Sequence, residues 1–169
     1  AETDHWALSG MRVSTEGNLV PLSKEVFAPG DNADLSRPAL ASSANGLSML
    51  VWEQQQSIYA NVIAADGDPW SADPVQINPT GGQNPTPSHT APAVSSYGNN
   101  KFAVAWQFEA TSPDIKVRLV KVVDSSKSLN LEAAVKLCGQ DCTSVSQEPP
   151  KLVEQPAVAS NDNQKGLAA

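Results

Sequence analysis

Short apolar runs separated by polar turn sequences follow one another along most of this chain. The clearest series begins with an extended piece at Pro38–Ser42, followed by an apolar run at Leu47–Glu53, an alternating stretch at Ile58–Ile63 and a short piece at Val75–Asn78. Runs of about four to seven residues that stop at Gly, Pro, Asn or Asp are typical of β-strands and their turns. The pattern therefore predicts four strands joined in chain order as an antiparallel meander.

Turn dipeptides separate these strands. Asn45-Gly46 and Asp66-Gly67 favour tight hairpin turns, because Asn, Asp and Gly tolerate the positive φ angles that such turns require. We therefore expect each dipeptide to join two neighbouring strands.

The same order of residues recurs further along the chain. From Pro92 the sequence PAVSSYGNNKFAVAWQ follows the pattern of PALASSANGLSMLVWE, which begins at Pro38, and it places Trp106 over Trp52. The strands expected in this second copy follow a turn at residues 97–100, and they are Phe102–Gln107, Asp114–Val123 and Leu131–Leu137. The last of these is also rich in Leu, Glu and Ala, which would suit one or two helical turns.

Partial copies flank the two complete ones. Pro156 begins a third copy with PAVASNDNQKGLAA, and Glu16-Gly17 fits over Asp66-Gly67 at an offset of 50 residues. We therefore expect a single repeat domain over 1–169, divided into a partial unit at 1–37, complete units at 38–91 and 92–155, and the start of a further unit at 156–169.

Units of this kind predict a β-propeller, in which four-stranded antiparallel blades repeat radially. The order PA(L/V)(A/S)S, followed by an apolar run into Val-Trp-Glu or Ala-Trp-Gln, resembles the propeller-like repeats of secreted bacterial surface proteins. The resemblance implies an all-β fold, but it does not imply a function, because such families include binding, scaffold and enzyme members. A β-sandwich of similar strands is the alternative, although it would not require tryptophans at equivalent positions.

The expected blades, two complete and two partial, are too few for a closed propeller. Open strand edges tend to pair with other chains. We therefore expect the chain to be a piece of a larger propeller, or one protomer of a multi-chain propeller in which other protein chains complete or cover the blade edges.

Charge excludes some classes of partner. The formal net charge is -7, and the Lys and Arg residues are scattered rather than clustered. A nucleic acid needs an electropositive face, so we do not expect one as a partner. No apolar run approaches the roughly 20 residues of a transmembrane helix, so we expect a chain that does not span a membrane.

Both cysteines lie in one short segment, at Cys138 and Cys142. Three intervening residues can close a small disulfide loop, which is the pairing that we expect; free thiols and a metal site are the alternatives. A disulfide would imply an extracellular, periplasmic or cell-surface location.

The tryptophans are the first candidates for ligand binding, because aromatic faces bind sugars and cations. Trp52 and Trp106 end apolar runs, so we expect them to pack between blades. Trp6 and Trp70 lie in less regular segments, and we take them as candidate carbohydrate-binding residues.

Other polar residues have simpler interpretations. Glu53 has Gln107 at its equivalent position rather than a second carboxylate, so we expect no catalytic pair. Asp66-Gly67-Asp68 and Asp31–Asp34 could bind calcium, but turn formation is the preferred interpretation and no cofactor is expected. His89, like His5, is expected in a solvated segment.

These observations predict a non-catalytic, extracytoplasmic interaction or structural module of propeller type within a larger assembly. Two alternatives remain at this stage: an oligomeric carbohydrate-binding propeller, and a non-catalytic fragment or subunit of a larger enzyme.

Overall fold

The computed structural model describes residues 8–22, 35–71, 73–79, 87–109, 114–136, 158–160 and 166–168. These residues form antiparallel β-sheets, and their one helical element is the short 3-10 turn η1 (Asp124–Ser126). The predicted all-β class is therefore confirmed. The described strands form open sheets and do not close into a barrel or ring.

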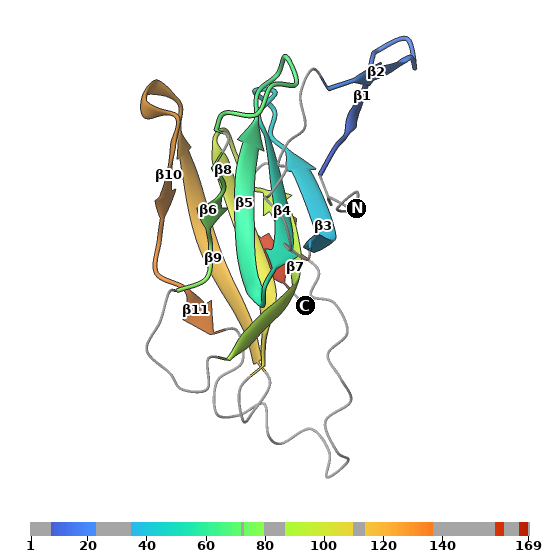
Figure 1. Ribbon diagram of the computed structural model, residues 1–169. Coiled ribbons are helices and arrows are strands. Elements are labelled where there is room, and N and C mark those ends of the chain that lie inside the picture. The colour runs from blue at the N-terminus through green and yellow to red at the C-terminus, as the bar shows by residue number, and fades with distance from the viewer. Residues whose placement is uncertain are drawn as a thin grey trace, which may run out of the picture.

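The first sheet is the meander expected between residues 38 and 91 (Figure 1). Its strands pair in chain order, and they are β3 (Leu35–Ser42), β4 (Ser48–Gln54), β5 (Ser57–Ile63) and β6 (Val75–Gln76). The last strand is shorter than the predicted Val75–Asn78, because only two of its residues pair with β5.

The second sheet repeats this order with an additional short strand. Its members are β7 (Ser88–Ser96), β8 (Lys101–Glu109), β9 (Asp114–Val123), β10 (Ser128–Leu131) and β11 (Val135–Lys136). The fourth strand predicted at Leu131–Leu137 is present as two pieces that begin earlier, because β10 and β11 pair separately with β9. The ten residues of β9 leave room along one edge for two short partners.

Two hairpins accompany the sheets. They are β1 (Met11–Val13) with β2 (Leu19–Pro21), and β12 (Val158–Ser160) with β13 (Gly166–Ala168). The first hairpin lies beside β3, on the side away from β9 and β10, and β12 lies against β7 and β8 (Figure 1).

The hydrophobic core lies between the two large sheets. Trp106 is fully buried in this core. Trp52 is also fully buried, but it lies on the face of β4 opposite to Val51, so packing between the two sheets is confirmed for Trp106 alone. The remaining core side chains come from the central strands and their neighbours, and they include Met49, Val51, Ile58, Phe102, Val104, Val120 and Val122. Strand β3 runs close to β7, so the first strands of the two sheets are neighbours.

Residues 54 positions apart occupy equivalent places in the two sheets. The pairing of Ala39 with Val51, for example, recurs as the pairing of Ala93 with Ala105, and all six pairs of the β3–β4 ladder recur at the same offset in the β7–β8 ladder. Both first strands also contain a bulge immediately before a proline, at Arg37 (φ 52°) and at Ala91 (φ 49°). Proline has no N–H to donate, so each ladder is interrupted at the same place.

The sheets contact each other through opposite faces. We call the face of the first sheet that carries Met49 and Val51 its front, and the opposite face its back. The second sheet has a front at the positions equivalent to these residues, and its back is the opposite face. The second sheet contributes Phe102 and Val104 to the core. Val104 corresponds to Leu50, which points to the other face of β4 from Val51 because side chains alternate along a strand. The front of the first sheet therefore packs on the back of the second.

Candidate functional site

The back face of the first sheet exposes apolar side chains. Leu40 on β3 is 57% exposed and Leu50 on β4 is half-buried. Their equivalents in the second sheet are Val94, which packs against the core, and Val104, which is fully buried. These two positions are thus covered by a neighbouring sheet in one case and open in the other, whereas Trp52 on the same back face is fully buried, as is its equivalent Trp106.

The β1–β2 hairpin borders this face. The Arg12 guanidinium donates a hydrogen bond to the backbone oxygen of Ala65 over 2.7 Å. A cavity of about 320 Å³ lies between the hairpin and the sheet, and its apolar lining includes Met11, Val13, Leu22, Leu40, Leu50 and Ile63. Because Met11 and Val13 are each more than 60% exposed, apolar surface continues from the sheet onto the hairpin.

The hairpin has the conformation of a later segment of the chain. In its turn the Ser14 N–H donates to the Asn18 oxygen and the Gly17 N–H donates to the Ser14 oxygen, both over 2.9 Å. The same two bonds, with the same lengths, recur 50 residues later in the turn that begins at Ala64. An equivalent pair of bonds, over 2.8 and 3.0 Å, also closes the turn that begins at Ser43 between β3 and β4, so the hairpin shares its turn geometry with both of these turns in the first sheet.

The turn at Asp66-Gly67 is confirmed. Gly67 has a φ of 96°, and the Asp66 carboxylate accepts a hydrogen bond from the Asp68 N–H over 3.0 Å. This bond uses the carboxylate to stabilise the turn itself. Within the described segments, no group of three or more His, Cys, Asp or Glu side chains is placed to hold a metal ion.

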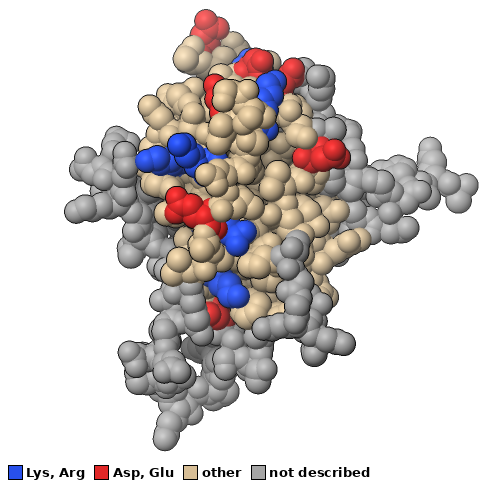
Figure 2. Space-filling model, turned by 90° about the vertical axis from the view of Figure 1, so that its left-hand side faces the viewer, with Lys and Arg blue, Asp and Glu red and all other residues tan. Residues whose placement is uncertain are grey.

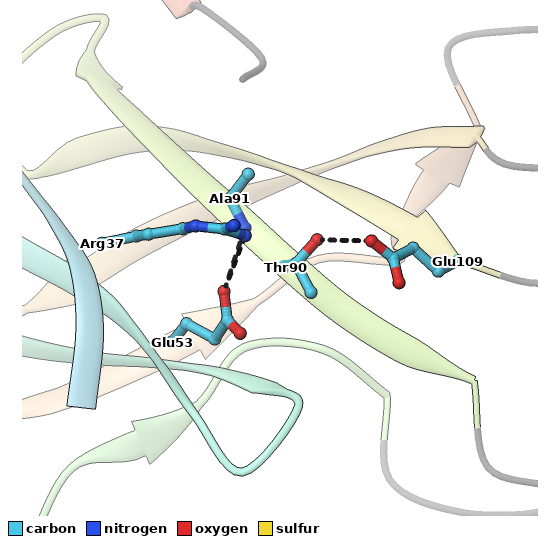
Figure 3. A network of polar contacts seen from close by, with 5 residues as sticks. All are labelled: Arg37, Glu53, Thr90, Ala91 and Glu109. Atoms are coloured by element: carbon cyan, nitrogen blue, oxygen red, sulfur yellow. Dashed lines mark hydrogen bonds and ion pairs between the residues drawn. The ribbon is translucent and has the colours of Figure 1, made fainter. Parts of the chain in front are cut away.

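A network of polar contacts joins the two bulges (Figure 3). One oxygen of the Glu53 carboxylate accepts from the Arg37 guanidinium and from the Ala91 backbone N–H, each over 3.3 Å. Nearby, the Thr90 hydroxyl donates to Glu109 over 3.2 Å. The Glu53 side chain is only 17% exposed, so this carboxylate links the equivalent bulges of both sheets.

His89 lies inside the protein, and the expectation of a solvated segment is wrong. It is the second residue of β7, pairs with Phe108 and is 5% exposed. The Trp106 indole N–H donates to His89 Nδ1 over 2.8 Å, so the ring proton is assigned to Nε2. Burial, together with the weaker effect of the positive charge of Lys116, lowers the pKa of His89 to about 4. The 54-residue offset, which places His89 over Leu35 on β3, could have identified this strand position.

Of the two carbohydrate-binding candidates, the structure describes Trp70 alone. Trp70 is half-buried and packs against the core, with its backbone N–H bonded to the Val62 oxygen over 2.9 Å. Trp6 lies outside the described residues, as do Cys138 and Cys142. The exposed apolar residues of the back face were missed because the sequence gives no sign of which face a neighbouring sheet covers.

Charges of both signs are mixed on the face of the molecule seen in Figure 2. Lys and Arg side chains lie beside Asp and Glu side chains there, with uncharged surface between them. In the part of the chain that the structure describes, no helix has the length and apolar character needed to cross a membrane.

Comparison with protein-family models found no match, and comparisons with curated proteins and with solved structures also found none. The arrangement of the described residues is therefore the basis for a functional proposal.

Proposed function

We propose that this chain is a non-catalytic interaction module of the β-propeller type that acts outside the cytoplasm. The observation that carries the proposal is the packing of the front of one sheet on the back of an equivalent sheet. A contact between unlike faces leaves one free face of each kind, so further sheets can add in the same sense and generate a ring or a stack. In a sandwich whose two sheets packed through equivalent faces, the two faces left free would also be equivalent. A further sheet could then not add through the same kind of contact.

The succession of first strands supports this proposal. Strand β3 lies close to β7, and β12, which begins the third copy in the sequence, lies close to β7 and β8. In a propeller the first strands of successive blades lie side by side around the axis. The order of β3, β7 and β12 is the order that such a ring requires.

The binding surface in this proposal is the back face of the first sheet together with the β1–β2 hairpin. Exposed apolar surface of this kind marks sites of protein contact. Its occupant is the front face of another sheet of the same type, because that is the surface that covers the equivalent positions of the second sheet.

The state of the polar groups supports a non-catalytic role. Glu53 binds both bulges, and His89 accepts a hydrogen bond from a buried indole. Each group thus has a structural partner inside the fold. Placement outside the cytoplasm rests on the short spacing of Cys138 and Cys142, which suits a disulfide.

Covalent surface labelling of the native particle tests the proposal. We expect Leu40 and Met11 to be labelled several-fold less in the particle than after its dissociation in mild urea. Val135, which is 61% exposed on β11, is the matched control and should be labelled equally in both states. Equal labelling of Leu40 in both states would overturn the proposed binding surface, and a hydrolytic activity lost in Glu53→Gln would overturn the non-catalytic role.

A further inference from the structure

Equivalent segments of the first strands differ in burial between the two large sheets. We call residues 35–38 on β3 the first bulge segment and residues 89–92 on β7 the second bulge segment. Every residue of the second bulge segment is buried, whereas Arg37 and Pro38 of the first are exposed. Strand β7 runs close to β3, β4 and β5, so the second bulge segment lies at the contact between the sheets. Its equivalent on β3 is open surface.

The second bulge segment donates hydrogen bonds across this contact. The His89 N–H donates to the backbone oxygen of Gln56 over 3.0 Å. The Ala91 N–H donates to the Glu53 carboxylate over 3.3 Å. The backbone of the second sheet thus supplies the donors here, and the first sheet supplies one backbone acceptor and one carboxylate.

Side chains of the second sheet donate in the same direction. A hydroxyl and a guanidinium bond to backbone oxygens of the first sheet, and the pairs are Ser96 with Ser42 over 2.8 Å and Arg118 with Ile77 over 2.5 Å. In the turns, the Asn45 amide donates in the opposite sense to Asn100. The front of the first sheet therefore acts mainly as an acceptor surface, and the back of the second sheet mainly as a donor surface.

The first bulge segment carries the equivalent donors. The β3–β4 and β7–β8 ladders share one register, and Arg37 and Ala91 have φ angles of 52° and 49°. Leu35 and Arg37 therefore direct their N–H groups away from β4, as their equivalents in the second sheet do from β8. A backbone N–H that is buried without an acceptor is destabilising. An occupant that buries this segment has to bring acceptors with it.

We infer, building on the proposed function, that the occupant of the back face is a protein sheet whose covering face is apolar at its centre and presents acceptors beside it. A carboxylate on its second strand accepts from the Arg37 N–H, as Glu53 accepts from Ala91, and a backbone oxygen accepts from Leu35. Its apolar centre covers Leu40, which is 57% exposed.

Charge at the first bulge segment favours a carboxylate over an amide. Arg37 stands at the position that Ala91 occupies in the second sheet. Its guanidinium bonds one oxygen of Glu53, yet its side chain remains 54% exposed. A carboxylate brought close to this positive charge is attracted to it, whereas a neutral amide is not.

Amide hydrogen exchange of the native particle tests the acceptors. The N–H groups of Leu35 and Arg37 should exchange at least about ten-fold more slowly in the particle than after its dissociation in mild urea. Those of His89 and Ala91 are the matched controls, because their acceptors lie in the same chain. The controls should be equally protected in both states.

The variant Arg37→Gln tests the charge, because it keeps the backbone N–H. Reassembly of the particle after removal of urea should be about three-fold weaker than for the wild type at low salt, and equal to it at high salt. Lys121→Gln makes the same change of charge at an exposed position on β9 and should behave like the wild type.

The outcomes separate this inference from the proposed function. Fast exchange at Leu35 and Arg37 in a particle that still protects Leu40 from labelling would overturn the inference and leave the proposed binding surface intact. The same salt dependence in Arg37→Gln and the wild type would overturn the carboxylate. Unprotected Leu40 would overturn both proposals.

Discussion

The buried contact between His89 and Trp106 predicts a specific pH dependence of stability. His89 Nδ1 accepts the indole N–H in its neutral form, so protonation would replace an acceptor with a donor and place a charge in the core. In the folded protein the pKa of His89 is about 4, whereas its ordinary value is 6.5. As the pH falls from 6.5 towards 4, the unfolded chain therefore binds a proton that the folded chain does not bind.

The size of this effect follows from proton linkage. Each pH unit in this interval removes about 1.4 kcal/mol from the free energy of unfolding, and the whole interval removes about 3 kcal/mol. The loss is complete below pH 4, where both states bind the proton. Above pH 6.5 neither state does, and the contribution of His89 to stability is constant.

The matched variant is His89→Asn, whose amide oxygen can accept the indole N–H of Trp106 without titrating. Urea unfolding curves followed by tryptophan fluorescence between pH 4.5 and 8 would give the free energy of unfolding for both proteins. Their difference cancels the contributions of all other titrating groups. The free energy of unfolding of His89→Asn minus that of the wild type should rise by about 1.4 kcal/mol for each pH unit below 6.5. If this difference stays constant between pH 8 and 4.5, the burial argument is refuted.

Three further predictions concern the bulges, the hairpin and the cysteines. Glu53→Ala should lower the free energy of unfolding by about 1 to 3 kcal/mol in urea titrations, because the buried Ala91 N–H loses its acceptor; no change would show that the contact is dispensable. Gly67→Ala, at a φ of 96° and with a Cβ 3.0 Å from a side-chain carbon of Leu22, should cost more than Gly17→Ala, which strains only the backbone at 83° by about 1 kcal/mol. Equal losses of stability would mean that the hairpin does not pack there. Alkylation of the unfolded, unreduced chain should modify no thiol, and mass spectrometry should detect two modified thiols after reduction; modification before reduction would contradict the expected disulfide.

The strands were predictable where sequence signals are local. Asn45-Gly46 and Asp66-Gly67 determine their turns through local backbone conformation and short-range side-chain hydrogen bonds, and the matching tryptophans identify the two central strands. The fourth strand of the second sheet was not predictable in the same way. It is divided because β10 and β11 pair with different parts of the same edge of β9. Such a division depends on the pairing of strands and is not visible in the local sequence.

The bulge contacts were beyond prediction for a related reason. The sequence places a proline in each first strand, but it gives no indication that Glu53 reaches the backbone of Ala91, 38 residues away in the chain. That contact requires the two first strands to be neighbours. The position of His89 had a usable signal in the 54-residue offset, whereas its local Pro and Ser neighbours favour a loop.

The composition of the central strands explains why the two sheets use opposite faces. A sheet with one solvated face alternates apolar and polar residues, whereas β4 and β8 contain almost continuous apolar runs that end in Trp52 and Trp106. Both faces of these strands are therefore suited to burial, and in β8 both faces are buried. The same rule applies to β4, where Leu50 remains partly open. Its back face consequently has the composition of an interface, which is the physical reason for expecting a second sheet upon it.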